Sequence, residues 1–296
     1  MCLDFSEICI NDREWILPLL QQSNFQSCEY SFANNLAWRR LADSQICRYD
    51  DLYFLRSFDE GKPRYTFPAG NGDVGKLVEL MSEDAAKYSE KLHLVTVLKP
   101  CVDRLREMYG DKVTAEADRA SFDYIYLADK LISLSGKKYH GKRNHIANFK
   151  KSDWEYRTLD ESMFYDCIAF SAEEFNAAAA YTSHSAVAEQ FAIDMFFKYF
   201  KQLELKGGAL YQNGKMVGFT IGERLNSDTF VIHIEKALHN VQGAYPTLFN
   251  EFIKKEAQGY KYINREDDVG IEGLRKSKLS YHPEYLLEKF DVIIDI

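Results

Sequence analysis

Hydrophobic positions in the second half of the chain follow a helical period first and a strand period afterwards. Residues 185–203 place aromatic and apolar side chains at helical spacing, which predicts a helix packed against a core. The stretch 208–222 then alternates around Asn213 and Gly214, a pair typical of a two-residue hairpin turn. Residues 229–235 alternate again. This half therefore begins with a helix that precedes three strands.

The rest of this half predicts further helices and strands. Pro246 suits the first turn of a helix, and the apolar residues after it give that helix one buried face. Residues 260–264 are the next expected strand, a helix with basic side chains follows, and 291–294 are the last expected strand. This order of elements predicts a mixed sheet with helices on it.

The first half shows a similar order of elements. A hairpin at 51–67 leads to a glycine-rich loop, a helix over 76–91, a strand over 93–98 and another helix from Pro100. Residues 122–127 are the last expected strand of this half. Hairpin, glycine loop, helix, strand and helix thus occur twice, which predicts an internal structural duplication.

Length and composition agree with two domains. The chain has 296 residues, of which 46% are hydrophobic and 14% aromatic, enough for two large cores. We expect an N-terminal domain over 1–130, a basic connecting segment over 131–152 and a C-terminal domain over 153–296.

Charge and cysteine content restrict the classes of function. The net charge of −8 disfavours a DNA-coating protein. No apolar run reaches the ~20 residues that cross a bilayer, and the start of the chain lacks the basic residues of a signal peptide. The cysteines are scattered, with no pair spaced for zinc or redox chemistry. We therefore expect a cytoplasmic protein with reduced thiols and no bound metal.

The loop at 70–75 fits the pattern G-x-G-x-x-G between a strand and a helix. Such glycines let backbone N–H groups approach a pyrophosphate, which would indicate a dinucleotide-binding enzyme. The regular βαβ alternation is missing, however, and Pro68 ends the strand before the loop. A plain glycine turn is the alternative.

The segment 135–151 is strongly basic and contains no acid. In an acidic protein it forms a local positive patch, suited to a phosphate on a nucleotide, a phospholipid or a tRNA backbone. A solvated linker between domains is the alternative. His140 and His145 have no carboxylate or thiol placed with them, so we do not expect them to bind a metal.

On the strand at 229–235, alternation places His233 and Glu235 side by side, on the face opposite Ile234. A neighbouring imidazole and carboxylate can take a proton from an amine or a hydroxyl. A half-exposed strand would also carry polar residues there without any chemistry.

The stretch 260–283 changes from acidic to basic. Three acids at 266–268 follow the expected strand, and the next helix carries Arg275, Lys276 and Lys278. Ligands of α/β proteins bind beyond the carboxyl ends of strands, which makes this junction a candidate site. Acids that cap a helix, together with solvated lysines, are the alternative.

Four segments together resemble one bacterial family. They are KKYHGKRNHIANF, GALYQNGKMVGFTIGE, VIHIEKA followed by QGAYPTLFNEF, and YINREDDVGIEGLRKSKLSYHP. In this order they are similar to the family named for the C-terminal domain of phosphatidylglycerol lysyltransferase, many members of which have no known function. The resemblance covers about 120–296 by motif, and the first half by order of elements only.

The resemblance implies an α/β (α+β) fold with two tandem GNAT-like domains, each a mixed central sheet flanked by helices. Related enzymes move an aminoacyl group from tRNA to a lipid or a peptide, whereas ordinary GNAT enzymes use acyl-CoA. The loop at Gly243 resembles the GNAT pyrophosphate loop, with one glycine where acyl-CoA enzymes carry more. Asn264 and Tyr281 resemble an asparagine and a late tyrosine of GNAT sites. The membrane-spanning part of lipid lysyltransferases has no counterpart here, so a lipid acceptor does not follow.

We therefore expect a transferase that moves an activated acyl or aminoacyl group to an amine or hydroxyl acceptor. The expected donor is a small molecule such as acyl-CoA, which is the candidate cofactor, or an aminoacyl-tRNA; no DNA partner is expected. Glu235, with His233, would remove the proton, and Tyr281 would protonate the leaving group. The residues expected to bind phosphate, substrate or oxyanion are Lys142, Arg143, Asn144, Gly243, Asn264, Arg265, Glu266, Asp267 and Lys278. A non-catalytic binding or regulatory protein that keeps the GNAT fold is the alternative.

Overall fold

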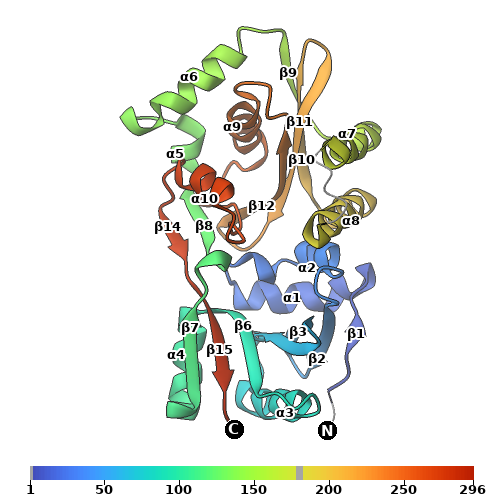
Figure 1. Ribbon diagram of the computed structural model, residues 1–296, viewed down its shortest axis with the longest axis vertical. Helices are drawn as coiled ribbons and strands as arrows, with labels where there is room; N and C mark the ends of the chain where they lie inside the picture. Colours follow the sequence, from blue (N-terminus) through green and yellow to red (C-terminus); the bar gives the residue numbers. More distant parts are fainter. Residues whose placement is uncertain (1–2, 178–182) are drawn as a thin grey trace. The chain divides into compact units, whose positions relative to one another are not determined.

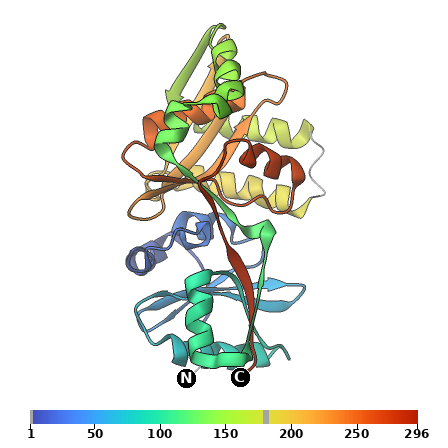
Figure 2. The same cartoon turned by 90° about the vertical axis from the view of Figure 1, so that its left-hand side faces the viewer.

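The protein forms two compact units in the computed structural model, which describes residues 3–177 and 183–296. Unit 1 comprises Met1–Asp123, Asp267–Arg275 and Leu286–Ile296, and unit 2 comprises Tyr124–Glu266 and Lys276–Tyr285. In each unit, helices pack against one sheet (Figures 1 and 2). Both units therefore have the mixed α/β character that the sequence predicts.

Unit 1 contains an eight-stranded sheet with the order β1-β2-β3-β4-β6-β15-β7, in which β5 pairs with β3. Its strands are β1 (Ser6–Glu7), β2 (Gln45–Tyr49), β3 (Leu52–Asp59), β4 (Lys62–Thr66), β5 (Ala69–Gly70), β6 (Leu92–Leu98), β7 (Val113–Ala117) and β15 (Lys289–Ile294). Its helices are α1 (Arg13–Ser23), α2 (Phe32–Trp38), α3 (Val74–Ala86) and α4 (Lys99–Tyr109). Because β15 comes from the other end of the chain, this sheet is complete only when both ends of the sequence are present.

Helices of unit 1 begin where the local sequence favours a start. Asp73 caps α3, because its side chain accepts a hydrogen bond from the backbone N–H of Lys76. Pro100 lies in the first turn of α4. Backbone N–H groups have no partner within the helix there, so the missing N–H of proline costs no hydrogen bond. The helix expected over 76–91 is thus present, although α3 ends earlier, at Ala86.

Unit 2 contains a seven-stranded sheet with the order β14-β8-β13-β12-β11-β10-β9. Its strands are β8 (Asp123–Leu127), β9 (Trp154–Thr158), β10 (Lys206–Gln212), β11 (Lys215–Arg224), β12 (Thr229–Ala237), β13 (Tyr262–Asn264) and β14 (Tyr285–Leu287). Its helices are α5 (Ala128–Ser133), α6 (His140–Phe149), α7 (Phe164–Ala177), α8 (His184–Lys198), α9 (Ala244–Glu256) and α10 (Glu272–Leu279). The ranges of β8, α10 and β14 each include residues of both units.

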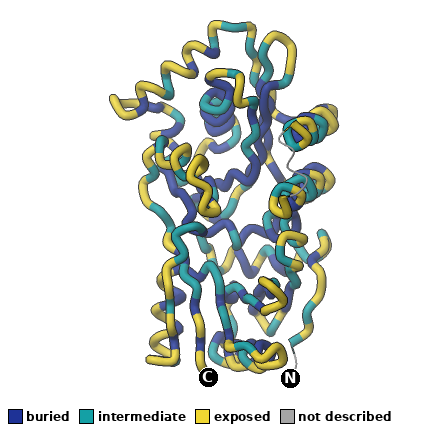
Figure 3. The backbone as a smooth tube through the Cα atoms, in the orientation of Figure 1, coloured by how far each residue is buried: buried dark blue, intermediate teal, exposed yellow. Residues whose placement is uncertain are grey.

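Helices cover both faces of the sheet of unit 2, with α7 and α8 on one face and α9 on the other (Figure 1). Phe219 of β11 packs its ring against Phe170 and Phe197 on the first face. Phe230 of β12 packs against Phe252 of α9 on the second. Burial is concentrated in these layers, whereas α10 contains no buried residue (Figure 3).

The two sheets have the same order of strands when each is followed from one edge, β1 in unit 1 and β9 in unit 2. Unit 1 has β1-β2-β3-β4-β6-β15-β7, and unit 2 has β9-β10-β11-β12-β13-β8-β14. In both, the fourth and fifth strands are parallel. The internal duplication predicted from the order of elements is therefore present.

One strand is exchanged between the two sheets. In the chain β8 follows β7, the edge strand of unit 1, but β8 fills the sixth place in the sheet of unit 2. Likewise β15 follows β14, the edge strand of unit 2, but fills the sixth place in unit 1. The strand that follows the edge strand of one unit is thus found in the sheet of the other unit, in both directions.

This exchange departs from the domain bounds expected from the sequence. The whole of 153–296 is expected in one domain, whereas 267–275 and 286–296 belong to unit 1. Periodicity indicates which face of a strand is buried but does not identify the neighbouring strands. The pattern of 291–294 therefore reveals a strand without revealing its sheet.

An irregular step in β12 changes the direction of its side chains. Ile221 of β11 pairs with Ile234, but the next residue, Gly222, pairs with Ile232, so His233 is extra. An extra residue of this kind is a β-bulge, and the alternation of faces shifts by one residue beyond it. The expectation that His233 and Glu235 share one face is therefore wrong.

Candidate functional site

Charged and aromatic side chains of unit 2 gather where β12 and β13 separate. The two strands pair only from Thr229 to Val231 on β12, although β12 continues to Ala237. Arg265 follows the end of β13, and its Nη2 atom lies 2.8 Å from Oε2 of Glu235. A side-chain ion pair thus joins the two segments beyond their last backbone pairing.

Aromatic rings surround the guanidinium of Arg265. Its Cζ atom lies 4.0 Å from the ring centre of Phe249 on α9, 5.0 Å from that of Tyr281 and 6.0 Å from that of Tyr126. Only 8% of Arg265 is exposed, and its Nη1 atom has no hydrogen-bond partner among the described residues. A buried donor without a partner costs about 1–3 kcal/mol, which makes this atom a candidate contact for a ligand. The Arg265 cluster is defined as Tyr126, Lys142, Glu235, Phe249, Arg265 and Tyr281.

Lys142 of α6 brings a second positive charge to the Arg265 cluster. Its Nζ atom lies 3.8 Å from the ring centre of Tyr281. Burial and the charge of Arg265 lower the pKa of Lys142 to about 8, although the carboxylate of Glu235 acts in the opposite direction. At neutral pH the ammonium form therefore predominates, and it loses its proton in the mildly alkaline range.

Tyr281 lies buried against α9, with its ring at 76° to the ring of Phe249 and 5.0 Å between the two centres. Burial raises the pKa of Tyr281, and the nearby charge of Arg265 offsets this only in part. The side chain therefore stays a phenol, which can donate a proton or a hydrogen bond.

Asn264 and Lys278 hold the backbone around Arg265. The side-chain oxygen of Asn264 accepts a hydrogen bond from the backbone N–H of Glu266, at 2.6 Å. The ammonium of Lys278 donates to the carbonyl oxygen of Arg265, also at 2.6 Å. Both residues were expected to contact substrate or phosphate; in the structure, these contacts position Arg265.

His233 contacts Glu266, Glu223 and Phe196, and not Glu235. Its Nδ1 atom lies 2.8 Å from Glu266 and its Nε2 atom 3.1 Å from Glu223, and its ring stacks on Phe196 of α8 with 5.2 Å between centres. Glu235 instead joins the Arg265 cluster, on the side of α9. The β-bulge at His233 explains why these two residues, expected to act together, are not brought together.

The two carboxylates keep the ring of His233 charged. Burial opposes the charged ring, but hydrogen bonds with Glu223 and Glu266 raise the pKa of His233 to about 9. Both ring nitrogens then donate hydrogen bonds, and neither has a lone pair to accept a proton. This geometry suits a structural link between β11, β12 and the segment after β13 better than a general base.

Packing against α6 accounts for the glycine at position 243. Gly243 precedes α9 with a φ of +86°. A Cβ atom there would lie 2.6 Å from the carbonyl oxygen of His145 and 3.0 Å from Cβ of Phe149, both on α6. The left-handed backbone and the close approach of α6 therefore explain this glycine without a bound phosphate.

Three other expected binding residues lie outside the Arg265 cluster. Arg143 donates hydrogen bonds to two carbonyl oxygens in the turn after α5. Asn144 is exposed, with its Nδ2 atom 3.1 Å from Nε2 of His140. Asp267 belongs to unit 1. The basic segment thus contributes Lys142 to the Arg265 cluster, but not its two following neighbours.

Packing likewise accounts for the glycine loop of unit 1. A Cβ atom at Gly70 would lie 2.0 Å from the carbonyl oxygen of Asp51, and one at Gly72 would lie 2.7 Å from Cγ of Leu52. The short strand β5, which includes Gly70, pairs with β3. These glycines permit close contact with β3, which favours the plain turn over a dinucleotide site.

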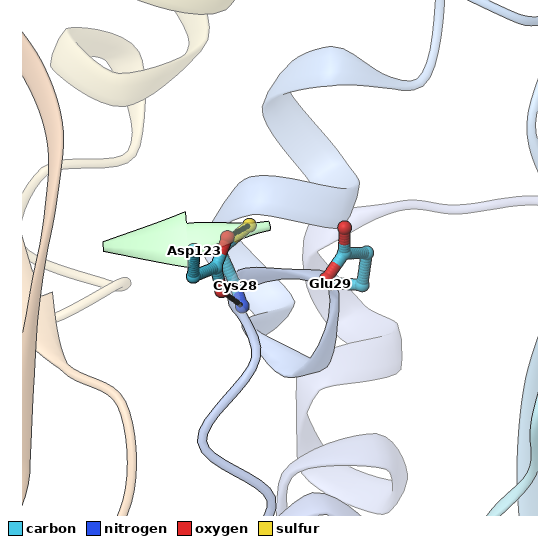
Figure 4. A group of neighbouring side chains, drawn as sticks. All are labelled: Cys28, Glu29 and Asp123. Carbon is cyan, nitrogen blue, oxygen red and sulfur yellow. Dashed lines mark hydrogen bonds between the residues drawn. The ribbon is translucent and has the colours of Figure 1, made fainter. Parts of the chain in front are cut away.

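Unit 1 contains a second buried group of charges (Figure 4). Figure 4 shows Cys28 and Glu29 beside Asp123, the first residue of β8. The Nζ atom of Lys289 lies 2.7 Å from Glu29, 2.7 Å from Asp123 and 3.6 Å from the sulfur of Cys28. Lys289 and Asp123 are both 0% exposed. The Lys289 cluster is defined as these four residues.

The same three acceptors have the spacing of metal ligands. Ligand atoms of Cys28, Glu29 and Asp123 all lie within 4.8 Å of one another. The ammonium of Lys289 contacts each of them, so the chain itself supplies the positive charge at this position. The arrangement therefore suits a structural ion cluster.

The sequence patterns do not indicate this cluster, nor the aromatic residues Tyr126 and Phe249 of the Arg265 cluster. Lys289 stands at the head of an apolar strand, which is the one visible sign of a buried lysine. Phe249 and Tyr126 look like ordinary core residues, because a hydrophobic pattern does not reveal a buried guanidinium beside them.

Within the described parts of the chain, no helix has both the length and the apolar character required to cross a membrane.

Comparison with known proteins matches residues 20–293 to the family model described as "Phosphatidylglycerol lysyltransferase, C-terminal". Among curated proteins, an uncharacterized protein of Mycoplasmoides gallisepticum is 26% identical over 184 residues, which span 58% of this chain and 56% of that protein. The chain thus spans little more than half the length of this relative.

Solved structures agree with this match. A conserved protein of unknown function from Bacteroides thetaiotaomicron is 35% identical, with a TM-score of 0.93 over 99% of this chain and 100% of that one. The C-terminal domain of a putative lysylphosphatidylglycerol synthetase from Agrobacterium fabrum is 13% identical, with a TM-score of 0.68 over 97% and 92%. A tandem GNAT protein of clavulanic acid biosynthesis is 10% identical, with a TM-score of 0.50 over 99% and 98%. The expected tandem GNAT-like fold is confirmed.

Proposed function

Because the chain belongs to the family of the phosphatidylglycerol lysyltransferase C-terminal domain, we propose that it transfers an acyl or aminoacyl group to an amine or hydroxyl acceptor. The Arg265 cluster of unit 2 is the proposed place of the reaction. One observation carries this assignment above others: Arg265 is buried, yet its Nη1 atom has no hydrogen-bond partner among the described residues.

The residues of the Arg265 cluster have complementary roles in this reaction. Attack of an amine or hydroxyl on the donor carbonyl creates negative charge on the carbonyl oxygen, which Arg265 and the ammonium of Lys142 stabilise. Glu235 accepts the proton of the acceptor through Oε1, since its Oε2 atom is occupied by Arg265. Tyr281, which remains a phenol, donates a proton to the leaving group.

The surroundings of Gly243 favour an aminoacyl-tRNA over acyl-CoA as the donor. In acyl-CoA enzymes of this fold, the corresponding loop binds the pyrophosphate. Here α6 approaches Gly243 so closely that a Cβ atom would clash with it. The exposed lysines of the segment 135–151 provide a positive surface on which an RNA backbone can bind.

The test is a transfer assay with hydroxylamine as the acceptor amine. Purified protein is mixed with tRNA that carries radioactive amino acids, and the aminoacyl hydroxamate is counted over the uncatalysed background. We expect a rate that depends on the protein concentration. Loss of a general base typically costs 10²–10⁴-fold in rate, and we expect Glu235→Gln to fall within this range. Binding of a non-hydrolysable aminoacyl-tRNA analogue should change little.

A matched control and a rival donor complete this test. Glu251→Gln alters another half-buried carboxylate of unit 2, one that bonds Lys150, and should leave the rate unchanged. Calorimetry with CoA and acetyl-CoA examines the other donor. Saturable micromolar binding of either, lost when Gly243 is replaced, would overturn the choice of donor but keep the reaction class.

A binding protein without catalysis is the second candidate, because the carboxylate of Glu235 is already engaged in an ion pair with Arg265. In that case Glu235→Gln would change ligand affinity, and no protein-dependent product would form with any donor. Product formation that Glu235→Gln leaves unchanged would also remove Glu235 from the mechanism.

A further inference from the structure

The Lys289 cluster joins the first residues of the two exchanged strands. Asp123 begins β8 and is the last residue of unit 1 before the chain continues in unit 2. Lys289 begins β15, three residues after the chain has returned to unit 1 at Leu286. The Asp123–Lys289 ion pair, at 2.7 Å and fully buried, thus links both exchanged strands at their start.

We propose that the Lys289 cluster is a latch that keeps the strand exchange within one chain, and that opening it creates a binding surface for the β15 strand of a second copy. This inference does not depend on the proposed function, because none of its residues belongs to the Arg265 cluster.

The surface is the gap that β15 would leave in the sheet of unit 1. β15 pairs with β6 on one side from Lys289 to Ile294, with an irregular step at Asp291, and with β7 on the other side from Phe290 to Ile294. Its departure would leave β6 and the edge strand β7 with unpaired N–H and C=O groups facing each other, a strong template for another strand. An identical strand from a second copy fits the same register, which is the usual basis of domain swapping.

The latch function follows from the burial of the ammonium. Lys289 contacts Glu29, Asp123 and Cys28 only when β15 is in place, since Lys289 belongs to that strand. Without the ammonium, the buried carboxylate of Asp123 and the partly buried carboxylate of Glu29 would lose their shared positive charge, which is unfavourable. Loss of Lys289 therefore weakens the attachment of β15 to unit 1 at the first residue of the strand.

A pair of surface cysteines can report which copy contributes β15. Thr114 of β7 and Ile293 of β15 are paired across the two strands, and both are exposed. The full chain with Thr114→Cys and Ile293→Cys is oxidised and separated on a non-reducing gel. A strand seated in its own chain gives a cross-linked monomer, whereas an exchanged strand gives a covalent dimer. The parent without the two substitutions corrects for the native cysteines.

We expect the cysteine pair alone to give cross-linked monomer, and addition of Lys289→Met to raise the covalent dimer at least fivefold. The control is Lys91→Met, which removes an exposed ion pair with Asp295 just beyond β15. It should give the pattern of the cysteine pair alone. Equal dimer in Lys289→Met and Lys91→Met, or monomer alone in both, would overturn the proposal.

A second variant covers the case in which Lys289→Met does not fold. Lys289→Met with Asp123→Asn removes the buried negative charge of Asp123 together with the ammonium, so unit 1 should fold while the latch stays absent. Hydrogen exchange of this variant should accelerate in 289–294 and leave β10 to β12 unchanged. Equal protection of residues 289–294 against hydrogen exchange in this variant and in the parent would also overturn the proposal.

Discussion

Lys289 in unit 1 and Arg265 in unit 2 are both buried cations, but their partners differ. Lys289 contacts three polar groups, two of them carboxylates. Arg265 has one ion pair with Glu235, while its Nη1 atom has no hydrogen-bond partner among the described residues. A buried charge whose donors are all used contributes to the fold alone. A buried donor that remains unused is more informative about function, because a ligand can complete it.

The largest expected effect concerns Lys289, the buried cation whose contacts are all within the fold. Lys289→Met leaves the buried carboxylate of Asp123 without the ammonium, and removing one partner of a buried ion pair typically costs about 3–5 kcal/mol. We expect a loss of this size in the free energy of unfolding of unit 1, measured by urea denaturation at low protein concentration. Lys91→Met, at an exposed pair, should cost at most about 1 kcal/mol. Similar losses in both variants would contradict a structural role for the Lys289 cluster.

His233 extends the comparison, because it is a buried cation of unit 2 whose partners are complete. Its pKa is raised from 6.5 to about 9. The charged ring therefore stabilises the fold fully below about pH 6.5, and this stabilisation is lost as the pH rises through about 9. The maximum contribution is about 3 kcal/mol, since each pKa unit corresponds to about 1.4 kcal/mol.

The test of His233 is the pH dependence of urea unfolding between pH 6 and 9.5. Wild-type protein should lose stability over this range, and His233→Gln should lose much less, because its side chain does not titrate. If both proteins show the same slope, His233 does not carry the charge that its two carboxylate partners suggest. His233 would then not be a buried structural cation of the kind that Lys289 is.

Two glycines of unit 2 test how the Arg265 cluster is positioned. Gly243 and Gly214 have similar positive φ values, +86° and +75°, but only Gly243 lies against another helix. Both alanine variants incur the backbone strain, about 1 kcal/mol, and Gly243→Ala adds overpacking of about 1–3 kcal/mol. Thermal unfolding should rank Gly243→Ala below Gly214→Ala. Equal unfolding temperatures would mean that α6, which carries Lys142, can move away without cost.

The sequence predicted the parts of this fold that depend on local pattern. The hairpin at Asn213 and Gly214, the helix after Pro246 and the repeated order of elements are all present. Two features could not be predicted in this way. A single extra residue at His233 changes the faces of β12, and the destination of β15 depends on pairing with distant strands.

The same limit applies to the candidate site. Glu235, Arg265, Lys142 and Tyr281 were expected at a site because charged residues and the family resemblance indicated them, and the structure places them together. Arg143 and Gly243 were expected for the same reasons, but their contacts serve packing and a turn. A charged residue or a glycine in a motif can bind a ligand or make a structural contact. The sequence does not distinguish these two roles, whereas the neighbouring residues in the structure do.

The smallest expected effect concerns Lys142, the titratable cation of the Arg265 cluster. If its ammonium stabilises the oxyanion, transfer needs the protonated form, so the rate should fall about tenfold per pH unit above the pKa of about 8. Lys142→Arg keeps the charge at every pH of the assay, because the pKa of arginine exceeds about 12. We expect this variant to lose activity at pH 7 through its altered geometry, yet to keep a constant rate up to pH 9.5. Lys150→Arg, at the end of the same helix and paired with Glu251, should retain the wild-type profile. An alkaline limb that persists in Lys142→Arg would assign the titration to another group and leave Arg265 as the sole cation of the proposed mechanism.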